Sequence, residues 1–194
     1  MPDAPRDRTA RVDVLVEGSR GPATTSSCTV IRDGDAIIVV DPGLASSQAA
    51  IIDPLRALGV VATDVTDVVI SHHHPDHTLN VALFTSARVH DHWAVYDFRG
   101  RWDDVDAEGR VLAPSVHLIR TAGHSDEDIA TVIGTPGDVV VCTHLWWTEA
   151  GPADDPFCAD PAVLRASRQR VLAIADVVIP GHGPAFRPTA TTPR

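Results

Sequence analysis

A short histidine-rich segment constrains this chain more than any other feature. Four histidines and one aspartate fall within seven residues, in the order Ser71-His72-His73-His74-Pro75-Asp76-His77, directly after the apolar residues 68–70. A strand that ends in such a segment brings several nitrogen and oxygen ligands to one point at the edge of a sheet. Neutral imidazoles together with a carboxylate suit zinc or a similar borderline metal ion. The segment therefore predicts a metal site, and the rest of the chain must supply the missing ligands.

Length and composition describe an ordinary globular chain. Its 194 residues are enough for one domain with a core, and 44% of them are hydrophobic and 22% charged. No apolar run reaches membrane-spanning length, and residues 1–8 lack the apolar core of a signal peptide. We therefore expect a cytoplasmic location and no membrane partner. The three cysteines (Cys28, Cys142 and Cys158) form no C-x-x-C pattern, so neither a disulfide framework nor a zinc ribbon is expected.

The charge of the chain bears on its partners. The formal net charge is −10, and all 16 basic residues are arginines. A strongly acidic chain repels polyanions, which argues against a nucleic-acid partner but leaves a local basic groove open. Arg165, Arg168 and Arg170 cluster, and a solvated helix face is the expected explanation. A small-molecule substrate is the favoured partner, and the oligomeric state is left open.

The apolar pattern predicts strands that alternate with a few helices. Residues 1–10 are expected to be a disordered arm and residues 11–194 one domain. Residues 98–115 are expected to form a long surface insertion and residues 149–160 a loop, and both are expected to supply the walls of a pocket. The expected strands are 12–16, 28–32, 36–40, 67–70, 87–90, 116–119, 129–133, 139–142 and 177–179, and the expected helices are 46–58, 78–84 and 160–175.

Further histidines occur where predicted strands end. His124 follows Gly123, His144 follows a strand that ends at residue 142, and His182 lies between two glycines after the last strand. Sheet folds gather the loops at strand ends along one edge, so we expect these three side chains to converge on the first segment. Other histidines are expected to be ordinary strand or surface residues (His90, His92 and His117). Trp146 and Trp147 are expected to be core residues or the wall of an apolar pocket.

The combined motifs resemble those of the metallo-β-lactamase superfamily. They are H-x-H-x-D-H at residues 72–77, G-H at 123–124, P-G-H-G at 180–183 and the D-x-G of Asp41-Pro42-Gly43. The resemblance covers roughly residues 12–188, and residues 160–186 further resemble the C-terminal stretch of one group within the superfamily. It implies an α/β fold, an αββα sandwich in a single domain, with a two-metal site at one edge of the sheets.

The resemblance also implies a ligand set. One metal ion would be held by His72, His74 and His124, and a second by Asp76, His77 and His182. The implied cofactor is Zn²⁺, two ions, with iron or manganese as alternatives. Two ions that share a hydroxide lower the pKa of its parent water and polarise a carbonyl or phosphoryl oxygen, and Asp76 would act in catalysis by orienting that hydroxide. The side chain of His73 is expected to point elsewhere, and Asp41 is the first candidate to fix an imidazole tautomer.

His144 departs from the family pattern. The superfamily usually has a metal-bridging aspartate at the position that His144 occupies in Cys142-Thr143-His144-Leu145. An imidazole can ligate one metal ion but cannot bridge two as a carboxylate does. We still expect His144 to be a metal ligand or to lie beside the metal site. Leu79 stands where the family often has glycine and narrows the space beside the histidine segment.

Three functions remain open at this stage. The leading hypothesis is a metal-dependent hydrolase, with a dinuclear zinc site, that uses a metal-bound hydroxide on a small ester, thioester, lactone or amide. The first alternative is an RNA phosphodiester hydrolase that uses the same site. The second is a non-catalytic metal-binding or ligand-sensing module, in which His144 has removed effective chemistry. Hydrolysis of β-lactams ranks below these because no export signal is expected.

Overall fold

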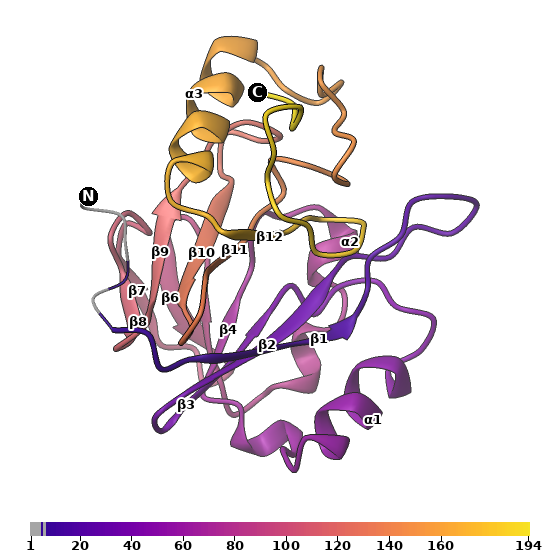
Figure 1. The fold of residues 1–194 in the computed structure, drawn as a ribbon. Coiled ribbons are helices and arrows are strands. Elements are labelled where there is room, and N and C mark those ends of the chain that lie inside the picture. Colours follow the sequence, from indigo (N-terminus) through magenta and orange to yellow (C-terminus); the bar gives the residue numbers. More distant parts are fainter. Residues whose placement is uncertain (1–4, 6) are drawn as a thin grey trace.

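Two β-sheets packed face to face form the centre of the molecule, with one helix on each outer face (Figure 1). The computed structural model describes residue 5 and residues 7–194. The first sheet has seven strands in the order β1-β2-β3-β4-β5-β6-β7, and the second has five in the order β12-β11-β10-β9-β8. This arrangement confirms the predicted αββα sandwich.

The strands of the first sheet follow the chain in order. They are β1 (Arg11–Val16), β2 (Cys28–Asp33), β3 (Ala36–Val40), β4 (Asp67–Val69), β5 (Arg88–His90), β6 (Ala94–Asp97) and β7 (Trp102–Asp104). Strands β3, β4 and β5 pair in parallel, and the other neighbours pair antiparallel. Gly34, with φ at +61°, forms the tight turn between β2 and β3.

The second sheet and the helices complete the sandwich. Its strands are β8 (Val111–Ala113), β9 (Val116–Arg120), β10 (Ile129–Gly134), β11 (Val139–Cys142) and β12 (Val177–Ile179). The helices are α1 (Ala49–Ala57), α2 (Pro75–Thr78) and α3 (Pro161–Leu172), with 3₁₀ turns at Ala62–Asp64 and Val81–Leu83. None of the described helices is long and apolar enough to cross a membrane.

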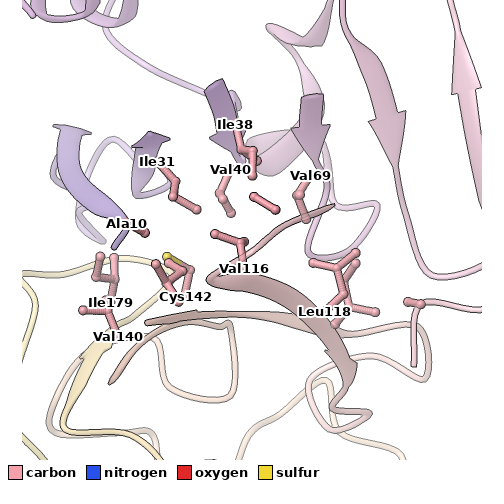
Figure 2. Close-up of a cluster of buried hydrophobic side chains, with 14 residues drawn as sticks. Ala10, Ile31, Ile38, Val40, Val69, Val116, Leu118, Val140, Cys142 and Ile179 are labelled. Carbon is pink, nitrogen blue, oxygen red and sulfur yellow. The ribbon is translucent and has the colours of Figure 1, made fainter. Parts of the chain in front are cut away.

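Three apolar clusters hold the layers together. The central cluster joins the facing sides of the two sheets, for example Ile38 and Val69 against Leu118 and Val140 (Figure 2). Ile51 and Leu55 of α1 pack on the outer face of the first sheet, and Leu164 and Val171 of α3 pack on that of the second. Strand β3 contributes to both faces of its sheet, which explains why it is apolar throughout.

Several sequence-based expectations need correction. The predicted insertion at 98–115 contains β7 and β8, which extend the two sheets at their edges, and β6 was not predicted. These strands are short, and β7 is exposed at every residue, so they carry no buried apolar pattern. The helix predicted at 78–84 instead begins at Pro75 and ends at Thr78, followed by a 3₁₀ turn.

Two further expectations failed because of tertiary contacts. Within the predicted arm, residues 1–4 and 6 lie outside the described residues, but Ala10 is fully buried and its N–H donates to the carbonyl of Gly134. The expected disorder therefore does not hold at Ala10. Arg168 is not part of a solvated face, because its guanidinium is fully buried and donates to the carbonyls of Leu145, Pro152 and Ala153.

Candidate metal centre

The segments that follow five strands meet at one edge of the sandwich. In the first sheet, β3 and β4 are parallel and therefore end on the same side. In the second, β9, β11 and β12 run in the same direction, because β10 is antiparallel to β9 and β11 while β12 is parallel to β11. The N–H of Ile129 donates to the carbonyl of Ser71 at 2.9 Å and ties the two sheets together at this edge.

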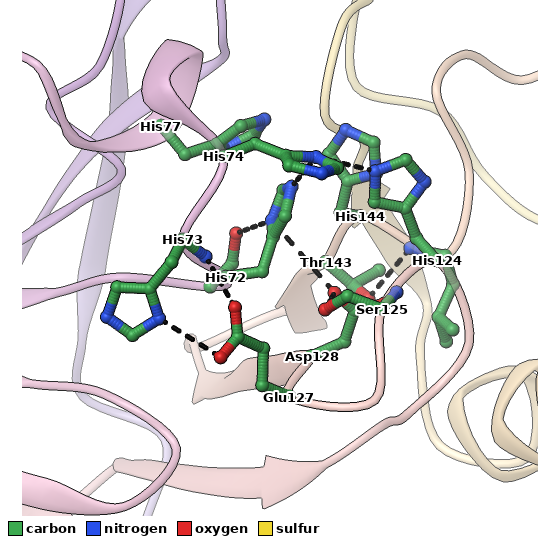
Figure 3. Close-up of polar contacts among 12 residues, drawn as sticks. His72, His73, His74, His77, His124, Ser125, Glu127, Asp128, Thr143 and His144 are labelled. Carbon is green, nitrogen blue, oxygen red and sulfur yellow. Dashed lines mark hydrogen bonds and ion pairs between the residues drawn. The ribbon is translucent and has the colours of Figure 1, made fainter. Parts of the chain in front are cut away.

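All seven predicted ligands lie at this edge. The rings of His72, His74, His124 and His144 turn toward one another (Figure 3). The seven ligands come from the segment after β4 (His72, His74, Asp76, His77) and from the segments after β9, β11 and β12 (His124, His144, His182). His72, His77, His124, His144 and His182 are buried, whereas His74 and Asp76 are partly exposed.

Two groups of donor atoms can be distinguished. In the first, Nδ1 of His74 lies 3.0 Å from Nε2 of His72 and 3.0 Å from Nε2 of His124. In the second, a carboxylate oxygen of Asp76 lies 3.5 Å from Nε2 of His182 and 3.7 Å from Nε2 of His77. Nitrogens on a zinc ion at 2.0–2.1 Å in tetrahedral geometry would lie roughly 3.3 Å apart, close to these separations.

His144 lies between the two groups. Its ring centre is 4.6 Å from that of His72, 4.1 Å from that of His124 and 4.8 Å from that of His77. Its nitrogens can join a metal-binding group with His72 and His124, or one with His77 and His182. The structure therefore places this imidazole where the resemblance implies a bridging carboxylate.

Oxygen partners select which nitrogen of each ring faces the site. Nδ1 of His77 lies 2.9 Å from Oδ2 of Asp41, and Nδ1 of His124 lies 2.8 Å from Oδ2 of Asp155. Nδ1 of His182 lies 3.0 Å from the carbonyl oxygen of Thr25. A proton on Nδ1 that is donated to these oxygens leaves the lone pair on Nε2, which is the atom that faces the cluster.

His144 lacks such a partner. Within the described part of the chain, its Nδ1 is buried without a hydrogen bond, and its Nε2 lies 3.1 Å from Nε2 of His182. Gly181 makes room for the ring, because a Cβ at this glycine would lie only 2.3 Å from Cδ2 of His144. Glycine at position 181, directly before His182, is therefore needed to accommodate the ring of His144.

The Asp41-Pro42-Gly43 turn packs against the histidine segment. Oδ1 of Asp41 accepts the N–H of Ser71 at 2.7 Å, while Oδ2 lies 2.9 Å from Nδ1 of His77, a position from which Asp41 can fix the tautomer of that ring. The backbone N–H of Leu44 donates to the carbonyl of Asp76 at 2.7 Å. This close approach requires glycine, because a Cβ at Gly43 would lie 1.7 Å from the same carbonyl oxygen.

Burial keeps most of the cluster neutral. Desolvation holds the pKa of His72 and of His144 well below the ordinary value, and the neighbouring histidines add to the effect. Burial also opposes the charged form of His77, but the Asp41 carboxylate outweighs it and raises the pKa of His77. Neutral imidazoles are the form that binds metal ions, so most of this cluster needs no proton release before binding.

Histidines that were not predicted to bind metal lie outside the cluster. The ring of His73 stacks on Trp93 and pairs with Asp91 and Glu127, so it points away from the site as predicted (Figure 3). His90 is buried and pairs with Asp67 at 2.7 Å, as a strand histidine. Of the two tryptophans, Trp146 is fully buried in the core, which is one of the roles predicted for the pair. Trp147 lies beside His124 but is not among the residues that line the cavity described below, so the predicted pocket wall is not found at this residue.

A cavity of about 430 Å³ opens onto the donor atoms. Five of the seven predicted ligands line it (His74, Asp76, His124, His144 and His182). Its apolar lining residues include Leu44, Leu79 and Phe157, and Arg20 and Thr24 also line it. The loop at 149–160 supplies Phe157 as expected, but 98–115 supplies none of the lining residues, so that part of the prediction was wrong. Residues of the loop before β2, Arg20 and Thr24, line the cavity instead.

Asp155 is a functional candidate that sequence reasoning missed. It is buried in the loop between β11 and α3, and it pairs with Nδ1 of His124. Burial opposes its charge, but the bonds to His124 and to the N–H of Phe157 outweigh burial and hold the pKa of Asp155 below its ordinary value. No motif marks this aspartate among its acidic neighbours, because its role depends on a fold that brings residues 124 and 155 together.

Replacement of Asp155 tests this arrangement. We expect Asp155→Ala to weaken metal binding about 10- to 100-fold, because His124 loses the group that fixes its tautomer and orientation. Asp154→Ala is the matched control, since Asp154 is exposed. Competition with a chromogenic chelator measures the affinity of each variant. Equal metal affinities of the two variants would contradict the role of Asp155.

The residues present fit a metal site on three counts. The donors are imidazoles and a carboxylate, which is the chemistry that zinc and iron accept. Nε2 of His77 is buried and, among the described residues, has no hydrogen-bond partner, although it lies beside Asp76. Each of three histidines also has an oxygen on its outer nitrogen, as metal-bound histidines do.

The fold and this cluster define a class of protein: the chain belongs to the metallo-β-lactamase superfamily, whose family model matches residues 21–184. Among curated relatives, metallo-β-lactamase domain-containing protein 1 of Xenopus laevis is 36% identical over 83% of this chain and 72% of its own length. The human protein of the same name is 35% identical over 95% of this chain and 66% of its own length. These matches confirm the group indicated by residues 160–186.

Solved structures confirm the fold at low sequence identity. A Thermotoga maritima protein assigned to the metallo-β-lactamases superposes with a TM-score of 0.74 at 20% identity, over 93% of this chain and all of that chain. The dizinc quorum-quenching lactonase AidC gives a TM-score of 0.68 at 16% identity, over 86% of this chain and 77% of that chain. A protein solved in a di-iron-bound form gives a TM-score of 0.65 at 20% identity, over 89% of this chain and 94% of that chain.

Proposed function

We propose that this chain is a metal-dependent hydrolase that acts on a small ester, thioester, lactone or amide, with two zinc ions as the favoured cofactor. The observation that carries the proposal is the meeting of seven potential ligands at one edge of the sandwich, five of which line a cavity that also has apolar lining residues. His72, His74 and His124 would hold one ion, Asp76, His77 and His182 the other, and His144 would ligate one of them. The di-iron neighbour keeps iron as the alternative metal.

Bound metal ions would supply a water of lowered pKa and a Lewis acid for the substrate's carbonyl oxygen. The residues of the chain would do the rest. Asp76 is the one carboxylate among the described residues that line the cavity, and its partly exposed oxygens can accept a hydrogen bond from the attacking water and so orient it. Leu44, Leu79 and Phe157 can exclude bulk water and hold an apolar acyl group.

A small acyl substrate suits this cavity better than RNA. The chain is strongly acidic, and Arg20 is the one arginine among the described residues that line the cavity. Binding of a polyanion depends on several basic contacts along its backbone. The lactonase AidC, which was solved with the product N-hexanoyl-L-homoserine, also shares this fold.

Metal removal tests the proposal directly. We expect the purified chain to contain about two equivalents of transition metal by mass spectrometry. It should also hydrolyse members of a panel of esters, thioesters and lactones. A strong chelator should remove both metal and activity, and zinc should restore them. A chain that binds no transition metal and gains no activity on addition of zinc would refute the proposal.

The same panel decides between an enzyme and a binding module. If the chain is an enzyme, the native protein is already active, and His144→Asp changes the affinity of the second site for its metal ion. If the native chain binds metal but is inactive, and His144→Asp creates activity, His144 has removed the chemistry and the chain is a metal-binding module. Cleavage of RNA that falls steeply with salt and is lost in His74→Ala would instead favour the nuclease.

A further inference from the structure

The lining of the cavity includes a cationic group that the hydrolytic site itself does not need. Arg20 lies in the loop between β1 and β2, and its guanidinium carbon is 3.5 Å from the ring centre of Trp147. Stacking on an indole face fixes the plane of a guanidinium and leaves the N–H groups at its edge free to donate. Among the described residues, Arg20 has no carboxylate in ion-pair contact, so its charge is available to a ligand.

The loop that carries Arg20 is attached to the metal centre. Ser19 and Thr25 form two backbone hydrogen bonds of 3.0 Å, so residues 19–25 close as a short hairpin with Arg20 inside it. The carbonyl of Thr25 contacts Nδ1 of His182 at 3.0 Å, and the N–H of Ser27 donates to the carbonyl of Gly181. Arg20 is therefore held in a defined position relative to His182.

Trp147 also links Arg20 to the metal centre, because it stacks under the guanidinium while its indole nitrogen lies 3.3 Å from Nδ1 of His124. Arg20 therefore lines the same cavity as His124 and His182.

Apolar side chains line the same cavity. They are Leu44, Leu79 and Phe157, and their exposed fractions are 38%, 60% and 56%. Exposed apolar side chains that gather at one cavity are typical of a binding site. Among the described residues, the lining of the cavity therefore combines apolar side chains, potential metal ligands and one arginine.

We propose that Arg20 determines substrate specificity by binding a carboxylate, so that the substrate class is an acyl compound with one negative charge near the bond to be cleaved. This proposal rests on the proposed hydrolase function. The planar guanidinium can accept a carboxylate in two parallel hydrogen bonds, and the acyl chain lies against Leu44, Leu79 and Phe157. One cation suits a monoanion, and the acidic chain around it disfavours polyanions.

Two matched ligands test the proposal without any turnover. N-hexanoylglycine carries a carboxylate, and N-hexanoylglycinamide is its neutral counterpart of nearly equal size. Isothermal titration of the full chain as purified should show at least about tenfold tighter binding of the carboxylate. Arg20→Ala should reduce this preference to about twofold or less, and Arg20→Lys should retain part of it. Arg56→Ala removes the same charge from an exposed side chain of α1 and should leave the preference unchanged.

The outcomes separate the two proposals. No carboxylate preference in the native chain, or a preference that survives Arg20→Ala, overturns the assignment of Arg20, because the anion then binds elsewhere. A preference that depends on Arg20 supports the assignment even if the chain hydrolyses no ester, thioester or lactone, and in that case the hydrolase proposal alone fails. If the chain hydrolyses these substrates but shows no carboxylate preference that depends on Arg20, the hydrolase proposal stands and the assignment of Arg20 alone fails.

Discussion

Gly43→Ala is expected to destabilise the protein by about 3 kcal/mol and to lower its melting temperature by roughly 6–12 °C. The added Cβ would lie 1.7 Å from the carbonyl oxygen of Asp76, 2.4 Å from its carbonyl carbon and 2.5 Å from Cα of His77. All three are backbone atoms, so the histidine segment itself would have to move. Thermal unfolding measures the loss of stability, and metal analysis measures the accompanying loss of bound metal.

Gly137→Ala is the matched control for this substitution. A Cβ at Gly137 meets no atom within 4 Å, and its backbone does not adopt a positive φ. We expect its melting temperature to stay within a few degrees of that of the native chain. A Gly43→Ala variant as stable and as rich in metal as Gly137→Ala would contradict the close packing of residues 41–44 against the histidine segment.

His77→Ala is expected to have the largest effect on activity. It removes a buried donor of the second proposed site, and the affinity for one metal ion should fall sharply while the other ion remains. Loss of several kcal/mol of transition-state stabilisation corresponds to a decrease of about a thousandfold in kcat/KM. Metal stoichiometry and hydrolysis of the best panel substrate are the two measurements.

The same motif provides the control for His77→Ala. His73 is four residues earlier, and its ring faces Asp91, Glu127 and Trp93 rather than the cluster. His73→Ala should therefore keep full metal content and most of the activity. Thermal unfolding of both variants separates loss of the site from loss of the fold. Equal loss of metal in the two variants would show that the two histidines do not have separate roles.

Local patterns were sufficient where a structural feature depends on neighbouring residues. Alternating or continuous apolar runs located β2, β3, β10 and β11 within a residue or two, because each of these strands buries most of its side chains. Asp160 and Pro161 located the start of α3, where the Asp160 side chain accepts the N–H of Ala162. Strands β6, β7 and β8 were missed because short edge strands are stabilised mainly by the partner with which they pair.

Distant contacts explain the other errors. Arg168 looks like a surface residue in a helix rich in arginine, but the carbonyls of Leu145, Pro152 and Ala153 solvate its charge inside the protein. Ala10 belongs to a polar arm in the sequence and becomes buried only through Gly134, far along the chain. Neither environment can be derived from the residues on each side of these positions.

The sequence by itself determined the set of potential ligands. Four of them are contiguous with one strand, and the other three directly follow strands that end at the same edge, so strand order alone brings them together. The tertiary structure decided the chemistry of each ring. The oxygens of Asp41, Asp155 and Thr25 lie between 31 and 157 residues from the histidines they contact, and they select the nitrogen that faces the site. It also decided that His144 lies between the two groups and that Arg20 lies beside them, because both positions depend on segments that meet only in the folded chain.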